Sequence, residues 1–454
     1  MVMLDTNLGK ELLEKDEKYV WHSMKPYNPN ATLVVEKSNG ARLVDVDGKQ
    51  FIDAMAGLFC VNVGYGRQEL AKAAYDQMIV NAYTPLSQGH VPAIKLAEKL
   101  NELLGGDYVI FFSNSGSEAN ETAFKIARQY HNQKGESSRY KIVSRYRAYH
   151  GNSMGALAAT GQAERKYKYE PLAPGFLHVS PPDSYRSNED AYTDLFEIPS
   201  VKEVDRVMTW EFSDTIAAMI LEPIITGGGI LMPPQNYLKG IKRVCEKHGA
   251  LLIVDEVICG FGRTGKPFGF MNYDIKPDII TMAKGLTSAY LPLSATAVKR
   301  EVYEVFKESG DYEYFRHVNT FGGHPAACAV ALKNLEIMEE EQLFDRSAQK
   351  GAQVLEALQN QLMSHPNVGD VRGKGLLIGI ELVKDKTTKE PLNIEAVNKV
   401  IATCKESGVI IGKNGTTVAG FNNVLILSPP LNISDDDIKI VLDTLAEAIH
   451  QLNV

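Results

Sequence analysis

The chain has few cysteines, no long apolar run and no excess of positive charge, and each shortage excludes a class of protein. Its five cysteines among 454 residues lie far apart and form no metal-ligand spacing, as in a reduced intracellular protein. The sequence lacks a stretch of about 18 apolar residues and a secretory signal, so we expect a cytoplasmic protein without membrane spans. With 48 basic and 56 acidic residues, it offers no broad basic surface for nucleic acid.

The order of apolar and polar segments predicts an α/β fold. Turn signals at Asn39-Gly40 and Asp47-Gly48 divide residues 33–53 into short β-rich runs, which indicates a small antiparallel meander. Apolar runs that end in small or polar residues then alternate with helical patterns, as in a mostly parallel central sheet. From about Pro325, amphipathic helices and two strand-like runs precede a closing helix opened by Ser434.

The length of the chain predicts more than one domain, because 454 residues exceed what one hydrophobic core usually supports. We expect residues 66–324 to form a large domain. Residues 1–65 and 325–454 would together form a smaller α+β domain built from both chain ends. Neither an internal repeat nor a low-complexity linker is visible, so we expect these domains to pack together.

The segment FFSNSGSEANETAFKIARQY predicts a strand, a turn of small residues and a helix. Ser115 and Glu118 have the spacing of a capping box at the helix start. A helix start presents free backbone N–H groups and a positive dipole end, and small residues let an anion come close. Gly116 and Ser117 are therefore candidates for holding a phosphate group, with an ordinary capped helix as the alternative.

The apolar run LLIVDEV places Asp255 at the end of an expected buried strand, where open α/β sheets bind their ligands. A carboxylate there needs a cationic partner, because burying it unpaired is costly. Side chains two apart on a strand share a face, so Val257 is expected to pack under a ring whose nitrogen Asp255 contacts. For Asp255 alone, a structural salt bridge and a nucleotide or metal site are the alternatives.

Lys284 ends a further strand-like segment, DIITMAKG, 29 residues after Asp255. A single lysine at a strand end is usually solvated, but a cleft with apolar walls would lower its pKa and favour amine catalysis. A Schiff-base lysine, an acidic partner and a phosphate cup are together the requirement of pyridoxal phosphate chemistry. The three segments therefore predict that cofactor.

The segments SNSGSEAN, AYHG, ILEP, IVDEVICGFGRTG, MAKGL and NTFGGHP occur in this order. In order and spacing the chain resembles the class III aminotransferases, from about residue 16 to the last helix. The resemblance implies the fold type I architecture of pyridoxal-phosphate enzymes, with a large cofactor-binding domain.

The resemblance also implies which residues contact the cofactor. Tyr149 would stack on the ring, Asp255 would bind the pyridinium nitrogen, Val257 would cover the other face and Lys284 would form the Schiff base. Thr320 would reach the phosphate of a neighbouring subunit, so a homodimer is implied, with a tetramer as a further possibility. The full implied set is Ser115, Gly116, Ser117, Tyr149, His150, Glu222, Asp255, Val257, Lys284 and Thr320.

Asp255 and Lys284 are the predicted catalytic residues of an aminotransferase. The Asp255 carboxylate would favour a protonated pyridine that accepts electrons, and Lys284 would act as the base that moves the substrate proton. The expected partners are a small-molecule amine donor and a keto acid acceptor, pyruvate in the first place.

Within the family, LEKDEKYVWHSMKPYNP and ATGQAERKYKYEPL resemble the ω-amino acid:pyruvate enzymes, and the taurine:pyruvate group in particular. Many ω-transaminases carry an arginine shortly before the final strand, but GVIIGKNGTTVAGFNNVLILSPP has none. Arg165 and Lys413 are therefore the candidates for binding a sulfonate or carboxylate, and a solvated surface cation is the alternative for each.

The resemblance places a set of side chains around the substrate pocket, with filling of the core as the alternative: Trp21, Leu58, Phe59, Tyr83 and Tyr149.

Other functions were weighed on the same residues. The GRTG segment at Arg263 and the glycines at 227–229 lack the Lys and Ser or Thr of a phosphate-binding loop, which excludes an NTPase. His150 and His324 have no partners at metal spacing, so no metal site is predicted. A diaminononanoate or γ-aminobutyrate aminotransferase, an aminomutase or a racemase stays open, whereas the catalytic residues argue against a non-catalytic scaffold.

Overall fold

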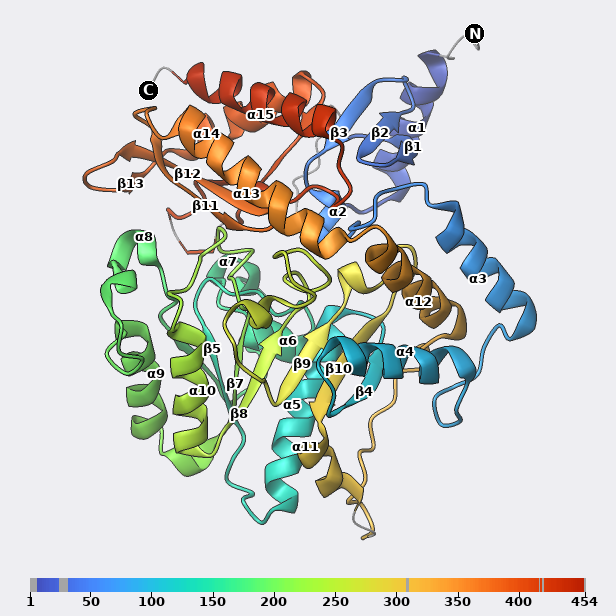
Figure 1. Cartoon of the computed structure of the whole chain (residues 1–454), viewed down its shortest axis with the longest axis vertical. Helices are drawn as coiled ribbons and strands as arrows, with labels where there is room; N and C mark the ends of the chain where they lie inside the picture. Colours follow the sequence, from blue (N-terminus) through green and yellow to red (C-terminus); the bar gives the residue numbers. More distant parts are fainter. Residues whose placement is uncertain (1–5, 24–31, 308–309, 416, 419, 453–454) are drawn as a thin grey trace.

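The computed structural model describes residues 6–23, 32–307, 310–415, 417–418 and 420–452. Within these ranges a seven-stranded sheet forms the centre of the molecule, in the order β4-β10-β9-β8-β7-β5-β6 (Figure 1). Strand β10 is antiparallel to β4 and β9, and the remaining neighbours are parallel. The predicted α/β fold with a mostly parallel sheet is confirmed. The strands are β4 (Tyr108–Ser113), β5 (Lys141–Arg145), β6 (Phe176–Val179), β7 (Ile216–Leu221), β8 (Leu251–Asp255), β9 (Ile279–Met282) and β10 (Ser294–Lys299).

Helices cover both faces of this sheet. Ile253 of β8 packs in a cluster with Phe124 of α5, whereas Leu252 and Val254 belong to the cluster that contains Leu238 of α10. Because both faces are buried, the central strands are apolar throughout instead of alternating. The helices are α1 (Thr6–Tyr19), α2 (Ala56–Phe59), α3 (Gln68–Val80), α4 (Val91–Leu103), α5 (Gly116–Gln133), α6 (Met154–Ala159), α7 (Ala163–Lys166), α8 (Ser184–Ser187), α9 (Pro199–Trp210), α10 (Tyr237–His248), α11 (Arg300–Glu304), α12 (Pro325–Glu340), α13 (Leu343–Leu362), α14 (Ile394–Glu406) and α15 (Asp435–His450).

Two smaller sheets lie above the central one in Figure 1, in the orders β1-β2-β3-β14 and β11-β12-β16-β15, with β13 paired to β12. Strands β1 to β3 form the predicted antiparallel meander. Strand β14, from the C-terminal part, runs parallel to β3, with Val409 opposite Ile52. Both chain ends thus share one sheet, which supports our proposal of domain boundaries near residues 65 and 324. The strands are β1 (Val35–Asn39), β2 (Arg42–Asp45), β3 (Gln50–Asp53), β11 (Val368–Lys374), β12 (Leu377–Asp385), β13 (Glu390–Pro391), β14 (Val409–Ile410), β15 (Gly412–Lys413) and β16 (Val424–Leu427).

The C-terminal helices connect these parts. Helix α12 packs along α3 and α4, so the C-terminal part begins in contact with helices that precede the central sheet (Figure 1). The closing helix α15 begins as predicted, because the Ser434 hydroxyl accepts a hydrogen bond from the Asp437 N–H at 3.0 Å. Among the described residues, no helix is both long and apolar enough to cross a lipid bilayer.

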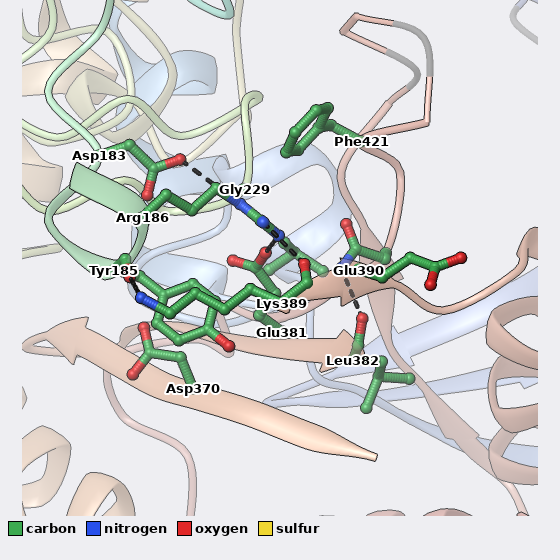
Figure 2. Close-up of polar contacts among 12 residues, drawn as sticks. Asp183, Tyr185, Arg186, Gly229, Asp370, Glu381, Leu382, Lys389, Glu390 and Phe421 are labelled. Atoms are coloured by element: carbon green, nitrogen blue, oxygen red, sulfur yellow. Dashed lines mark hydrogen bonds and ion pairs between the residues drawn. The ribbon is translucent and has the colours of Figure 1, made fainter. Parts of the chain in front are cut away.

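A buried group of charges joins α8 to the C-terminal sheet (Figure 2). The Arg186 side chain points from α8 toward Glu381 of β12, with which it forms an ion pair, and donates to the Lys389 carbonyl at 2.7 Å. Arg372 of β11 lies 2.8 Å from the other Glu381 oxygen and donates to the Ile230 carbonyl. Burial opposes ionisation of Glu381, but the two arginines outweigh it and hold its pKa below the usual value.

Replacing Glu381 tests this connection. Glu381→Ala is expected to lower the free energy of unfolding by about 3–5 kcal/mol, because it removes the buried carboxylate that lies between two largely buried guanidinium groups. The measurement is the midpoint of urea unfolding.

The matched control is Glu390→Ala, which removes an exposed carboxylate paired with Lys384 and should change stability by no more than about 0.5 kcal/mol. Equal shifts for the two variants would contradict a structural role for the buried pair.

Candidate active site

Asp255 and Lys284 come from adjacent parallel strands and meet at the same edge of the central sheet. Asp255 is the last residue of β8 and lies opposite Thr281 of β9. Lys284 lies two residues after the end of β9, at the start of a short 3-10 helix, Lys284–Leu286. Because carboxyl ends of parallel strands form the usual ligand edge of an α/β sheet, this edge is the candidate active site.

The Asp255 carboxylate is buried and hydrogen-bonded at both oxygens. Oδ2 lies 2.9 Å from the Asn120 amide nitrogen and 2.9 Å from His150 Nδ1, and Oδ1 accepts from the Val257 N–H at 3.1 Å. The side-chain oxygen of Asn120 in turn accepts from the Thr281 hydroxyl at 2.8 Å. The cationic partner expected from the sequence is therefore the His150 ring, which pairs with the carboxylate when it is protonated.

The sequence analysis missed Asn120. This residue belongs to the SNSGSEAN segment. It lies one helical turn after Gly116 and Ser117, so the three residues are neighbours on the surface of α5. The available signal was an asparagine one helical turn after the expected phosphate-binding residues, on the same helix. It was overlooked because only the start of the helix was considered.

Lys284 is half-buried and has a left-handed backbone, with φ of 46°. Its ammonium nitrogen lies 5.7 Å from the centre of the Phe59 ring. Burial lowers the pKa of the Lys284 amine, although Cys60, Asp255 and Glu222 act in the opposite direction. A larger share of the amine is thus neutral than for a solvated lysine, which is what a nucleophile or base requires.

The start of α5 forms a narrow cradle. The Ser115 hydroxyl caps the helix by accepting from the Glu118 N–H at 3.3 Å, but the Glu118 carboxylate accepts from Asn114 instead of Ser115, so only half of the capping box is present. A Cβ at Gly116 would lie 3.0 Å from both Val257 methyl groups. The Ser117 hydroxyl donates to the Asn152 side chain at 2.9 Å.

Val257 does not share a strand face with Asp255, contrary to the prediction from the sequence. Strand β8 ends at Asp255, so Val257 lies in the following turn and strand alternation does not orient it. Its methyl groups instead face Gly116, and its N–H holds Asp255.

Glu222 lies behind Tyr149. Its buried carboxylate accepts from the Tyr149 N–H at 3.2 Å and from the Thr226 N–H and hydroxyl at 3.1 and 2.8 Å. Burial raises the pKa of this carboxyl. The Arg165 guanidinium lies 4.6 Å from the centre of the Tyr149 ring, a cation–π distance.

Asp53 holds the segment that contains the predicted pocket residues Leu58 and Phe59. Its buried carboxylate accepts from the Met55 and Gly57 N–H groups at 2.9 and 2.7 Å. It thereby holds a segment in which Phe59 has a φ of 62°, a strained value for a non-glycine residue. Phe59 faces Lys284, whereas Leu58 is 73% exposed.

Other predicted residues lie on the surface of the single chain. Trp21 is 99% exposed, and Tyr83 is exposed with its hydroxyl donating to the Thr320 carbonyl at 2.7 Å. Neither fills the core, so that alternative was wrong for both. Lys413 of β15 is half-buried, and burial lowers its pKa while Glu164 on α7 raises it.

Comparisons with known proteins agree with this geometry. The family described as Aminotransferase class-III matches residues 23–449. An uncharacterized aminotransferase, YhxA, of Bacillus subtilis is 63% identical, covering 100% of this chain and 99% of its own, and the taurine--pyruvate aminotransferase of Bilophila wadsworthia is 43% identical, covering 94% of each. The crystal structure of a Bacillus anthracis aminotransferase has a TM-score of 0.97 and 65% identity, covering 98% and 99% of the two chains.

The chain therefore belongs to the class III aminotransferases, which are pyridoxal-phosphate-dependent enzymes that use amine and keto-acid substrates.

The described residues fit that cofactor. Pyridoxal phosphate requires a lysine amine, an acidic partner and an anion cradle. Lys284 and Asp255 lie at adjacent strand ends, and Gly116 leaves free the space that a Cβ would fill against Val257. Within the described residues, no three of His, Cys, Asp and Glu gather as a metal-binding group.

Glu256, next to Asp255, supplies a test of burial at this edge. Its carboxylate accepts from the Gly269 and Phe270 N–H groups at 2.8 and 2.7 Å, and burial raises its pKa to about 8. Between about pH 4.5 and 8 the folded chain keeps a proton that the unfolded chain has released, so stability falls as pH rises.

Glu256→Gln carries no titrating proton and is expected to show a weaker fall of stability over that range, besides an overall loss from one missing acceptor. Urea unfolding at several pH values measures both effects. The control is the exposed Glu336→Gln, and an unchanged pH dependence in Glu256→Gln would contradict the raised pKa.

Proposed function

We propose that this protein is an ω-transaminase that moves a terminal amino group from taurine, β-alanine or a related amine to pyruvate. The placement of the Arg165 guanidinium over Tyr149, next to the Asp255 and Lys284 edge, is the observation that carries the proposal. It puts a group that binds sulfonates and carboxylates in a bidentate manner over the ring of Tyr149, whose neighbour in the chain, His150, contacts Asp255. The taurine--pyruvate aminotransferase among the relatives supports the same choice of substrate.

The cofactor-holding roles follow from the geometry. The N–H groups at the start of α5, with the Ser115 and Ser117 hydroxyls, would bind the phosphate, and Gly116 would give it room. Tyr149 and Val257 would lie on the two faces of the ring. When bound, the cofactor supplies a protonated pyridine ring that accepts electrons from the carbon bearing the amino group.

Asp255 would stabilise the protonated ring nitrogen, and Lys284 would act as the nucleophile and the base. His150, Asn120 and the Val257 N–H stabilise the charged form of Asp255, which suits it to a protonated ring nitrogen. Lys284 would bind the cofactor covalently, be displaced by the donor amine and then move the proton at the carbon that bore the amine. Since pyruvate replaces the first product before the second half-reaction, the kinetics would be ping-pong.

Arg165 and Lys413 would divide the binding of the substrate acid group. Arg165 offers a planar fork of donors, whereas Lys413 is a point charge on β15, and burial lowers the pKa of its amine. Leu58, Phe59 and Tyr149 would form the pocket wall within this chain. Trp21 would belong to the same pocket only in an assembled protein, because it is exposed here.

We also propose a homodimer in which Thr320 contributes to the partner subunit's phosphate site. Thr320 is exposed, and the side chains of Tyr83, Leu86, Val318 and Phe321 around it form an exposed apolar patch, as at protein interfaces. A second copy of the chain would cover this patch. A cytoplasmic location is proposed as well, supported by cysteines that are all unpaired.

The function is tested with the purified protein, pyruvate and a panel of amines. Alanine is expected to form with taurine or β-alanine, and Lys284→Ala should lower the rate at least about a thousandfold. Borohydride reduction should fix the cofactor to the Lys284 peptide, as seen by mass spectrometry. Lys333→Ala, a partly exposed position on α12, is the control. Failure of every amine to convert pyruvate would refute the proposal, and so would cofactor fixed at another lysine.

The shared site is tested by complementation. Lys284→Ala and Thr320→Glu should each be inactive, the second because a carboxylate repels the phosphate. A mixed dimer contains one intact site, so co-expressed chains that pair at random should recover about a quarter of the wild-type activity. No recovery in a mixture shown to contain mixed dimers would contradict a site shared between subunits.

A further inference from the structure

Gln162 connects Arg165 to the backbone at Arg147. Its side chain is 1% exposed, and its amide nitrogen donates to the Arg147 carbonyl at 3.0 Å. Its amide oxygen accepts from Arg165 Nε at 2.7 Å. Because the carbonyl of Arg147 can only accept, the amide of Gln162 has a single orientation, and its oxygen must face Arg165.

Arg147 is itself held in place. It is 5% exposed, pairs with Asp183 at 2.8 Å and donates to the Gly228 carbonyl at 2.6 Å. Its backbone N–H also donates to the Gly161 carbonyl, directly before Gln162. The carbonyl that orients Gln162 therefore belongs to a fixed residue.

Phe421 extends this arrangement into the loop between β15 and β16. Its ring centre lies 5.2 Å from the guanidinium of the buried Arg147 and 4.8 Å from that of the partly exposed Arg186, so the ring lies within cation–π distance of two cations. Figure 2 shows Phe421 over the charge group that contains Arg186 and Glu381. The Phe421 carbonyl accepts from the Asn414 side chain at 2.6 Å.

The same loop contacts α7 from the other side. The Thr417 carbonyl accepts from the N–H of Ala163, the first residue of α7, at 3.2 Å. A Cβ at Gly415 would lie 3.7 Å from an Arg165 guanidinium nitrogen. Arg165 is thus held between the loop, the Gln162 amide and the face of the Tyr149 ring.

We propose that Gln162 and Phe421 are positioning residues that determine donor specificity by fixing Arg165 over Tyr149. This proposal rests on the proposed role of Arg165 in binding the acid group. Arginine loses much conformational freedom when it binds an anion, and an already oriented side chain loses less. Without Gln162 or the Phe421 ring, Arg165 would explore other rotamers, and binding of an acidic donor would weaken more than that of an uncharged amine.

The donor half-reaction separates these effects, because omitting pyruvate removes the second acid from the assay. It is followed by the change of cofactor absorbance in wild type, Gln162→Leu and Phe421→Leu, with taurine and with 1-propylamine. We expect Gln162→Leu to raise the taurine concentration for half-maximal rate about tenfold, with little change for 1-propylamine. Phe421→Leu should shift selectivity in the same direction. The matched control is Gln359→Leu on α13, which removes a side-chain amide that donates to the Val371 carbonyl of β11.

Equal losses for both donors in both variants would show a structural role and overturn the proposal, as would unchanged selectivity. If Arg165→Ala leaves the taurine reaction unchanged, Arg165 does not bind the acid group and the proposal also fails. In both cases the transaminase function stands. A wild-type protein that reacts with no amine would instead refute the proposed function itself.

Discussion

The buried carboxylate of Asp255 is the constraint on which the site depends. A charge at the end of a fully buried strand is costly unless hydrogen bonds and an opposite charge stabilise it. Three separate elements meet that need: Asn120 from α5, His150 from the loop after β5, and the Val257 N–H from the turn after β8. These contacts bring together the segments that would also hold the phosphate and stack on the ring under the proposed function.

The proposed chemistry requires opposite charge states of the two ionisable groups at this edge of the sheet, Asp255 and Lys284. Asp255 has to stay charged, whereas Lys284 has to give up its proton. The Asp255 carboxylate accepts hydrogen bonds at both oxygens. Burial lowers the pKa of Lys284, at which no comparable hydrogen bond is seen among the described contacts. Neighbouring groups whose pKa values are shifted by their surroundings are typical of catalytic sites, because the environment as well as the residue type sets the protonation state.

Arginines connect this site to the rest of the fold, and two of them, Arg147 and Arg263, are buried. Arg147 and Arg372 both bind carbonyls of the glycine segment behind Tyr149, at Gly228 and Gly229. Arg263, in the GRTG segment, donates to the Pro429 carbonyl and so joins the loop after β8 to the C-terminal part. Guanidinium groups suit this task, since each can bind several carbonyls in fixed directions. Arg263, the arginine of the GRTG segment, thus has a structural role.

The sequence by itself determined the architecture and pointed to the candidate catalytic pair, because apolar runs, turn residues and strand-end positions are local signals. The strand ends at Asp255 and Lys284, the helix start at Ser115 and the closing helix at Ser434 all lie where the pattern predicted. Contacts between distant segments were beyond those signals. Only the tertiary structure decided that His150 is the partner of Asp255, that Val257 is oriented by a turn, and that Gln162 lies between Arg147 and Arg165. Those contacts depend on side-chain direction in a packed interior, which local periodicity does not encode.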